Sequence, residues 1–494
     1  MVEKKIGSIY AFINLFKATL GVGAFAMPQA FKLAGFWTGL VLTVVIGFIN
    51  AHGMMKIVQS AQFLVAKRLN LKSTPNGGAK VYPESTYDYI EADTGEDQPV
   101  TLRKLTLVKE DGNDENQKQI FTVESEIKKE VEEETEEVNF DYGEMAGEAF
   151  ASNDSPKLRK FGKPAMIFVN VVLICLQLGL SSAFYIFVVD HAKEMVDHIS
   201  GKDFNRKNMF FVVLPFFFLI ASVSNVVFMS LIGLAGIVLL MVPLVILYVR
   251  MFQMSHLPIG KLTGFSNIEG FFMSCGNIIF AYIGQGVLLG IENKMKKPKQ
   301  MLGLLGVIST SMFLVTLFNT ATGLLGYITY GEDLKGSITL NLTNKPLDFS
   351  VKIMLMVMTY FSYNLIIFPI VDTLFPLMEK YLQDKGRGRF TIGLVHYAFR
   401  WLIAIVSFAI AIAIPNFKDI IPLIGTLTGT LLALFLPPLL HMTIPNRTHL
   451  FPTHNLFFNA TAVQATSAFI RTFQAWLRLA HKKSFASKNF EEPL

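Results

Sequence analysis

Long apolar runs separated by short polar connections dominate this chain of 494 residues. Runs of about 18 or more apolar residues are long enough to cross the hydrocarbon core of a bilayer as helices. The pattern predicts an all-α polytopic membrane protein, with span boundaries defined to about four residues. The ten predicted spans are 9–34, 38–64, 163–190, 209–227, 229–250, 268–291, 301–324, 350–375, 391–413 and 418–441.

Two polar segments interrupt or follow these spans. Residues 69–162 form an acidic insert, and its part from 70 to 138 is charged and poor in apolar clusters, which predicts that the insert is largely disordered. A solvated tether is one interpretation of 70–138, and a docking segment for a cytoplasmic partner is the other. In the tail, 442–494, the stretch 455–480 predicts either an interfacial amphipathic helix or an eleventh span.

Charge in the short connections predicts the orientation. The chain has a net charge of +6, and its basic residues concentrate in the membrane part and its loops. They indicate a cytoplasmic N-terminus rather than nucleic-acid binding, which we do not expect. The loop 330–350 then lies outside, and its sequon at Asn341 is a glycosylation candidate. A plasma membrane and a lysosomal or late endosomal membrane both fit this pattern.

The first span contains helix-breaking residues at membrane depth. Gly21, Gly23 and Pro28 lie inside an otherwise apolar stretch. Each glycine costs a helix interior about 1 kcal/mol and each proline about 3 kcal/mol. Lipid cannot satisfy the freed backbone groups, so broken helices occur where they line a cavity. The sixth span has a similar composition, although small residues in either span can simply allow close helix packing. Its glycines are Gly276, Gly284, Gly286 and Gly290.

Three further motifs, taken in order, resemble a known family. They are INAHGMMKIV (49–58), LQLGLSSAFYIFVVDH (176–191) and FAYIGQGVLLGIENKMKKPKQ (280–300). Together with the broken first span they resemble the amino acid/auxin permease family, especially insect members of its proton-coupled amino acid transporter branch. The resemblance covers residues 8–68 and 139–440. It implies a LeuT-like 5+5 inverted repeat whose first and sixth transmembrane helices are discontinuous.

The resemblance also implies a substrate site at the two breaks. Free N–H groups where span one restarts suit an amino acid carboxylate, and carbonyls freed in span six suit its ammonium group. Side chains on spans three, six and eight would set size selectivity, although Gln177 and Asn364 can equally bond neighbouring helices. The candidate substrate-binding residues are Gly21, Val22, Gly23, Ala24, Gln177, Phe280, Ala281, Tyr282, Ile283, Tyr363 and Asn364.

Two positions depart from the proton-coupled branch. Asn14 stands where relatives have a histidine, and Ile283 stands where they have a glutamate. Intramembrane ionisable groups are the natural proton relays. His52 is the remaining proton-coupling candidate, or else a packed, hydrogen-bonded histidine. Asp190 and His191, at the outer end of span three, are expected to be solvated.

We therefore expect an amino acid transporter that works by alternating access, with proton coupling left open. An amino-acid-sensing protein that signals through the insert is the alternative. The sequence contains no P-loop, no spaced His/Cys metal site and no recognisable catalytic motif. We accordingly expect no enzymatic activity, no cofactor and no metal, with the lipid bilayer and a small amino acid as partners.

Overall fold

The computed structural model describes residues 5–72, 139–224, 226–343, 345–414 and 416–444. Within these residues the structure is helical, with one isolated β-bridge. The elements are α1 (Ser8–Thr19), η1 (Val22–Ala26), α2 (Met27–Ala34), α3 (Phe36–Lys72), α7 (Tyr142–Ala151), α8 (Pro156–Arg159), α9 (Gly162–Ser200), α10 (Arg206–Ala221), α11 (Val226–Gln253), η2 (Ile259–Lys261), α12 (Ile268–Phe280), α13 (Gln285–Glu292), η3 (Pro298–Met301), α14 (Val307–Tyr330), η4 (Gly331–Asp333), η5 (Ile338–Asn341), α15 (Pro346–Asp384), α16 (Arg389–Ala413), α17 (Phe417–Ile424), η6 (Gly425–Gly429), η7 (Leu431–Phe435) and α18 (Leu436–Thr443).

Helices occupy all ten predicted spans. Nine of the described helical stretches are long and apolar enough to cross a bilayer. The fourth predicted span is α10, which has only 16 residues. The seventh begins six residues later than predicted, at Val307, because the preceding residues form η3 and a turn in which Gly303 has a φ of +101°. That turn requires the left-handed region, which glycine adopts at no steric cost.

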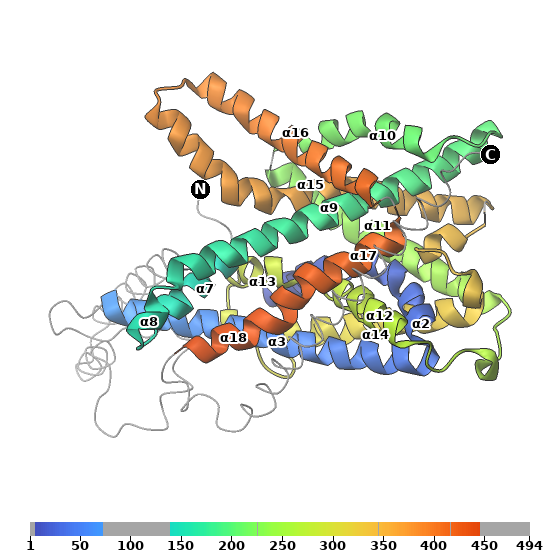
Figure 1. The fold of residues 1–494 in the computed structure, drawn as a ribbon, viewed down its shortest axis with the longest axis horizontal. Coiled ribbons are helices and arrows are strands. Elements are labelled where there is room, and N and C mark those ends of the chain that lie inside the picture. The colour runs from blue at the N-terminus through green and yellow to red at the C-terminus, as the bar shows by residue number, and fades with distance from the viewer. Residues whose placement is uncertain (1–4, 73–138, 225, 344, 415, 445–494) are drawn as a thin grey trace, which may run out of the picture.

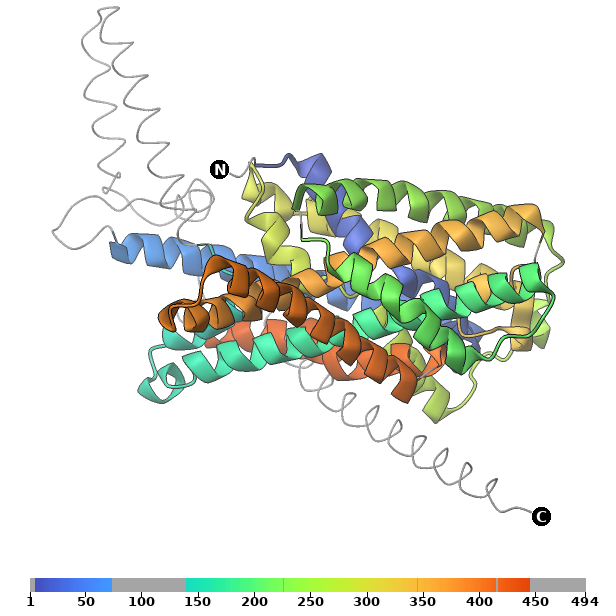
Figure 2. The same ribbon diagram turned by 90° about the horizontal axis from the view of Figure 1, so that it is seen from above.

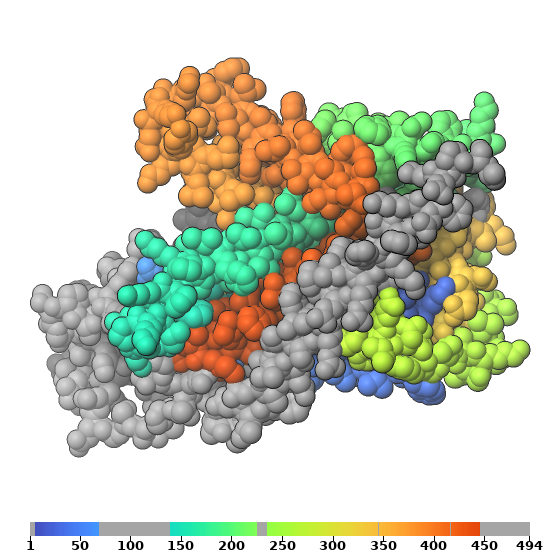
Figure 3. Space-filling model, viewed as in Figure 1, coloured from blue at the N-terminus to red at the C-terminus, as the bar shows by residue number. Residues whose placement is uncertain are grey.

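The helices run broadly along the long axis of the molecule, so their ends gather on two sides (Figure 1). We call one side, where α1 begins and α7 and α8 lie, the N-terminal side. The opposite side, where α2 ends and α10 begins, is the loop side, and the view from above shows the same separation (Figure 2). In the space-filling view, α9 crosses one face of the molecule beside the α15–α16 hairpin (Figure 3).

The end of the acidic segment is helical, and it follows residues 70–138, the part whose composition predicts disorder. Asp141 caps α7, because its side chain accepts from Glu144 N while the Glu144 carboxylate accepts from Asp141 N. This capping box satisfies two of the N–H groups left free at a helix start. α7 packs against α9 and α3, so it belongs to the helical bundle. Residues 73–138 and the stretch 455–480 lie outside the described residues.

Candidate substrate site at two helix breaks

The first span is broken, as predicted. α1 ends at Thr19, and the chain then leaves the helical path at Gly21, whose backbone is extended (φ −90°, ψ −153°). The short helix η1 follows, and α2 begins with Pro28 in its first turn, where the missing N–H of proline costs nothing. The N–H of Ala24 donates to Gly21 O at 3.2 Å, so one of the four expected carboxylate donors has a partner within the chain.

The sixth span is broken at the predicted position. α12 ends at Phe280 and α13 begins at Gln285. In between, Ile283 N donates to Phe280 O at 3.3 Å, and the Asn319 amide on α14 donates to Ala281 O at 3.2 Å. Two of the expected ammonium acceptors therefore already accept one hydrogen bond each, and a carbonyl oxygen has a second lone pair for another.

The two breaks lie in direct contact. A Cβ on Gly23 would lie 2.7 Å from the Cα of Ala281 and 3.1 Å from the Phe280 ring. On the other side of the sixth-span break, a Cβ on Gly284 would lie 2.6 Å from the Oγ1 of Thr19, the last residue of α1. Glycine is thus required at both positions by close approach, and the structure brings residues 21–24 and 280–283 together.

A third irregular element, which the sequence analysis missed, packs beside the sixth-span break. The tenth span contains two π-helical turns, η6 and η7. A Cβ on Gly425 would lie 1.8 Å from Gly276 O in α12. Single π turns inside α-helices are frequent at functional sites. The available signal was the run of small residues GTLTGT (425–430) inside an apolar span.

Two candidate side chains near the breaks have different environments. The Gln177 amide nitrogen on α9 lies 3.6 Å from the position of a Cβ on Gly286, so Gln177 faces α13 just after the break. The Tyr282 side chain instead points into α3, where its hydroxyl donates to Thr43 O at 3.0 Å. Of the two, Gln177 is therefore the one placed beside the segment where substrate is expected.

Tyr363 and Asn364 on α15 are directed toward neighbouring helices. The Tyr363 hydroxyl donates to Ser407 on α16 at 3.3 Å, and its ring packs edge-on against Phe217. The Asn364 amide donates to Val223 O at 2.9 Å, while its oxygen accepts from Arg400 at 2.7 Å. In this conformation Asn364 hydrogen-bonds neighbouring elements. The sequence left open whether Asn364 would do this or line the substrate site.

Arg400 is a buried charge that the sequence analysis did not single out. Its side chain is 2% exposed, and it donates to Ala221 O at 2.5 Å and to Val223 O at 2.9 Å. These carbonyls lie at the end of α10, where helical N–H partners run out. A cation beside a helix C-terminus is also favoured by the helix dipole. An arginine inside the apolar run 391–413 could have indicated this buried charge, because ionisable residues within membrane spans usually face the protein interior.

The ionisable groups of the second and third spans are buried to different degrees. His52 is half-buried on α3, one residue before Gly53, whose Cβ would lie 2.8 Å from Ala433 O in the tenth span. The expectation that Asp190 and His191 are solvated is wrong. His191 is fully buried, and Asp190 pairs with Arg206 at 2.6 Å, because the neighbouring loop and α10 cover this end of α9.

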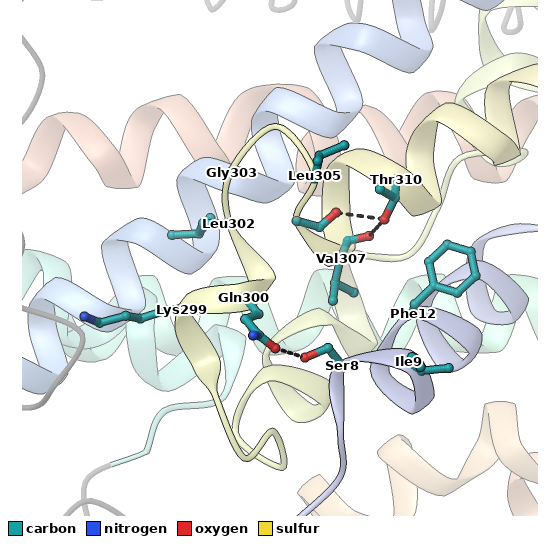
Figure 4. A pocket seen from close by; sticks show the side chains of 11 residues that line it. Ser8, Ile9, Phe12, Lys299, Gln300, Leu302, Gly303, Leu305, Val307 and Thr310 are labelled. Carbon is teal, nitrogen blue, oxygen red and sulfur yellow. Dashed lines mark hydrogen bonds between the residues drawn. The ribbon is translucent and has the colours of Figure 1, made fainter.

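A separate cavity of about 530 Å³ lies on the N-terminal side (Figure 4). It is bounded by the first turns of α1 and α14 and by the connection that follows η3, and the Ser8 hydroxyl bonds the Gln300 side chain at its edge. Its residues on α1 end at Phe12, about two helical turns before the break. This cavity is therefore distinct from the site formed by the breaks.

With this geometry established, comparison with known proteins gives the family. Residues 4–71 and 121–474 match the family described as transmembrane amino acid transporter protein. The chain belongs to this family. Its fold class is accordingly that of a polytopic, LeuT-like transporter, and the family is one of transporters rather than enzymes.

Two relatives cover most of this chain. It is 25% identical over 445 residues to the Probable amino acid transporter skat-1 of Caenorhabditis elegans, covering 87% of this chain and 79% of that protein. It is 23% identical over 434 residues to the Proton-coupled amino acid transporter-like protein pathetic of Drosophila melanogaster, covering 87% of this chain and 76% of that protein. Both names agree with the family that the sequence motifs indicated.

Proposed function

We propose that this protein carries amino acids across a membrane by alternating access, with the substrate held between the two helix breaks. The observation that carries this proposal is the contact of Gly23 with Ala281, which joins the breaks of the first and sixth spans. Family membership and the printed names of both relatives support an amino acid as the substrate.

The chemistry of the site follows from the freed backbone groups. The N–H groups of Gly21, Val22 and Gly23 lie near the start of a helical segment, where a carboxylate is favoured. The second lone pairs of Phe280 O and Ala281 O are suited to an ammonium group. Since the breaks now touch, substrate entry requires the first and sixth spans to separate, which makes Gly23 and Ala281 the closing surfaces of the site.

The loop side is held together by backbone hydrogen bonds between spans one, two and six. Phe36 N donates to Thr263 O at 2.8 Å, and Ser266 N donates to Ala34 O at 3.0 Å. We assign the N-terminal side to the cytoplasm from the positions of the basic loops, so the loop side faces outward. Asn341 then lies on the outward side as the proposed glycan acceptor, and its amide donates to Asp333 O at 2.9 Å.

Protons are the proposed driving ion. The name of the Drosophila relative supports this choice. Asn14 and Ile283 cannot carry a proton at neutral pH, so the proton-binding group must lie elsewhere in the chain. His52, half-buried on α3, is one proposed group.

Uptake into proteoliposomes tests the proposal. Purified protein is reconstituted, and uptake of a radiolabelled amino acid mixture is measured with and without an imposed pH gradient. Gly23→Leu should abolish uptake, because the new side chain would enter the Ala281 backbone. Gly393→Leu is the matched control, since a Cβ there meets nothing within 4 Å. Normal uptake by Gly23→Leu would contradict the site assignment, and absence of uptake by the parent protein would contradict the function.

A further inference from the structure

A lid formed by residues 331–343 covers the first helix break on the loop side. It connects α14 to α15 and contains η4 and η5. Ile338 and Thr339 of the lid are fully buried, and η5 contacts η1. A Cβ on Gly326 would touch both Pro28 of α2 and the Ile338 side chain, so the lid packs directly onto the start of α2. Opening the loop side therefore requires this lid to move.

His191 on α9 is the lid's hydrogen-bonded anchor. Its Nδ1 lies 2.8 Å from Phe187 O, and its Nε2 lies 2.9 Å from the Thr339 hydroxyl. A carbonyl can only accept, so Nδ1 carries a proton, and in the neutral imidazole Nε2 then accepts from the Thr339 hydroxyl. The Thr339 oxygen lies 2.7 Å from the Ser337 hydroxyl, which must then donate to it. With a neutral imidazole, the donors and acceptors thus follow one order: Ser337 donates to Thr339, Thr339 donates to His191, and His191 donates to Phe187 O of α9.

The surrounding charges disfavour a second cation at this position. Lys352 of α15 is fully buried, donates to Leu342 O of the lid at 2.9 Å, and acts electrostatically on His191. Its carboxylate partner is Glu194 of α9, at 2.7 Å. Other charged groups near His191 and the lid are paired: Asp190 of α9 with Arg206 of α10, Glu332 of the lid with Lys32 of α2, and Asp348 of α15, which accepts from Thr343 of the lid, with Arg250 of α11. Lys418 of α17 packs against Gly336, and Asp333 and Lys335 of the lid are exposed.

Protonation of His191 would reverse the direction of its bond to the lid. Nε2 would become a donor to the Thr339 oxygen, so the Thr339 hydroxyl would turn to donate to Ser337, and the proton of the buried Ser337 hydroxyl would need a new acceptor. The imidazolium would also repel the Lys352 ammonium, and Glu194 cannot neutralise both cations. Both effects weaken the attachment of the lid to α9 and α15, while the neutral imidazole strengthens it.

We propose that His191 is a proton-binding residue that releases the lid, so that acid on the loop side opens the path to the substrate site. This inference rests on the proposed transport function and adds a gating proton to it. The proton comes from loop-side solvent, binds Nε2 and returns to that solvent before the lid closes again, so it controls access to the site without itself crossing the membrane. His191 acts as a positioning residue, since its contacts are with the lid rather than with the breaks.

Lid opening can be measured apart from transport. In a background with Cys175 and Cys275 replaced by serine, a thiol is placed at Ile338, which is buried, or at Lys335, which is exposed. Labelling with a membrane-impermeant maleimide is followed from about pH 7.5 to 4.5, a window that extends below the ordinary range of histidine because burial and the Lys352 ammonium disfavour the imidazolium. The ratio of the Ile338→Cys rate to the Lys335→Cys rate corrects for the pH dependence of the thiol itself. We expect this ratio to rise about fivefold in acid.

His191→Gln decides the assignment, because glutamine can donate and accept hydrogen bonds but does not titrate. We expect this variant to lose the acid-induced rise in labelling and the acid stimulation of uptake. His256→Gln, an exposed histidine on the same side, should keep both. Thr339→Val removes the hydrogen bond to His191 but leaves the repulsion between a protonated His191 and Lys352 in place. We therefore expect this variant to raise the labelling ratio already near neutral pH and to show a smaller acid-induced rise, and it decides the assignment if His191→Gln fails to fold.

The outcomes separate the two proposals. An acid response that survives unchanged in His191→Gln, or a Thr339→Val variant that labels like the parent near neutral pH, would overturn the role of His191 and leave the transport function intact. Absence of amino acid uptake by the parent would overturn the transport function, while the labelling ratio would still decide whether His191 controls the lid.

Discussion

The Cα of Ala281 occupies the space into which any side chain at Gly23 would project, since a Cβ there would approach within 2.7 Å. Because the obstacle is backbone, no single side-chain truncation relieves it. The second contact between the two spans differs, because the obstacle is a side chain. A Cβ on Gly284 would lie 2.6 Å from the Thr19 hydroxyl, and a second substitution can remove that hydroxyl.

Gly284→Ala should therefore lose most transport activity, and Gly284→Ala with Thr19→Ala should recover a large part of it. Overpacking of this kind costs about 1–3 kcal/mol. Removal of the hydroxyl leaves the flexible end of the Met54 side chain at 3.0 Å and the next Thr19 atom at 3.6 Å. Initial uptake rates normalised to purified protein measure the effect. Equal loss in the single and double variants would refute the contact, and Thr19→Ala alone is the control.

Arg400→Met should lower stability strongly. It removes donors to Ala221 O, Val223 O and the Asn364 oxygen. Val223 O keeps its hydrogen bond from the Asn364 amide, and each of the other two acceptors left unsatisfied costs about 1–3 kcal/mol. The melting temperature in detergent should fall by several degrees, with Arg400→Lys intermediate because lysine lacks the planar fork of donors. Arg389→Met, at the exposed start of α16, should melt like the parent.

Asn364→Ala tests whether that residue binds substrate or stabilises the helix contact. Since both polar atoms of Asn364 bond Val223 O and Arg400, we expect lower thermal stability with a KM for amino acid uptake within about twofold of the parent. Combined with Arg400→Met, its effect on stability should be clearly less than additive. A KM raised tenfold at unchanged stability would instead assign Asn364 to the substrate site.

Ile6→Pro should slow transport by uncoupling α1 from α13. Ile6 N donates to Lys294 O at 2.7 Å, and Lys296 N donates to Ile6 O at 2.9 Å, which joins the N-terminal segment to the end of the sixth span. Proline removes the first of these donors. Initial uptake rates should fall severalfold, whereas Ile6→Ala, which keeps the N–H, should transport like the parent. Equal uptake rates in both variants would show that the backbone hydrogen bonds of Ile6 do not contribute to transport.

Tyr142→Phe should destabilise the contact between α7 and the tenth span by about 1 kcal/mol, the usual value of one hydrogen bond. The Tyr142 hydroxyl donates to Leu432 O at 3.0 Å, and burial raises the pKa of its phenol. The stabilisation is therefore fully present below the unfolded pKa of about 10 and is lost only at higher pH. Melting curves of parent and variant should differ by a constant amount across neutral pH.

The sequence predicted those features that depend on neighbours along the chain. Apolar runs defined the spans, and Gly21, Gly23 and Gly284 marked the breaks, because the cost of glycine in a helix is local. The capping pair Asp141 and Glu144 was an equally local signal for α7, but it was overlooked within the acidic segment.

The sequence did not predict those features that depend on which helices pack against each other. Tyr282 and Asn364 lie on the expected spans, yet their side chains face α3 and α10 because of how the helices rotate against one another. The burial of His191 likewise depends on a lid nearly 150 residues further along the chain (|i−j| = 148). Spacing along a helix cannot supply such information.

The π turns of the tenth span have a mechanical consequence. A π turn contains one residue more than an α turn, so when it moves along a helix, the residues it passes rotate by about 100° around the axis. Gly425 and Gly429 sit on this element where it meets α12 and Ile283. The middle of the tenth span can thus present a different set of side chains to the sixth-span break by rotating about its own axis, while α17 before it and α18 after it stay in place.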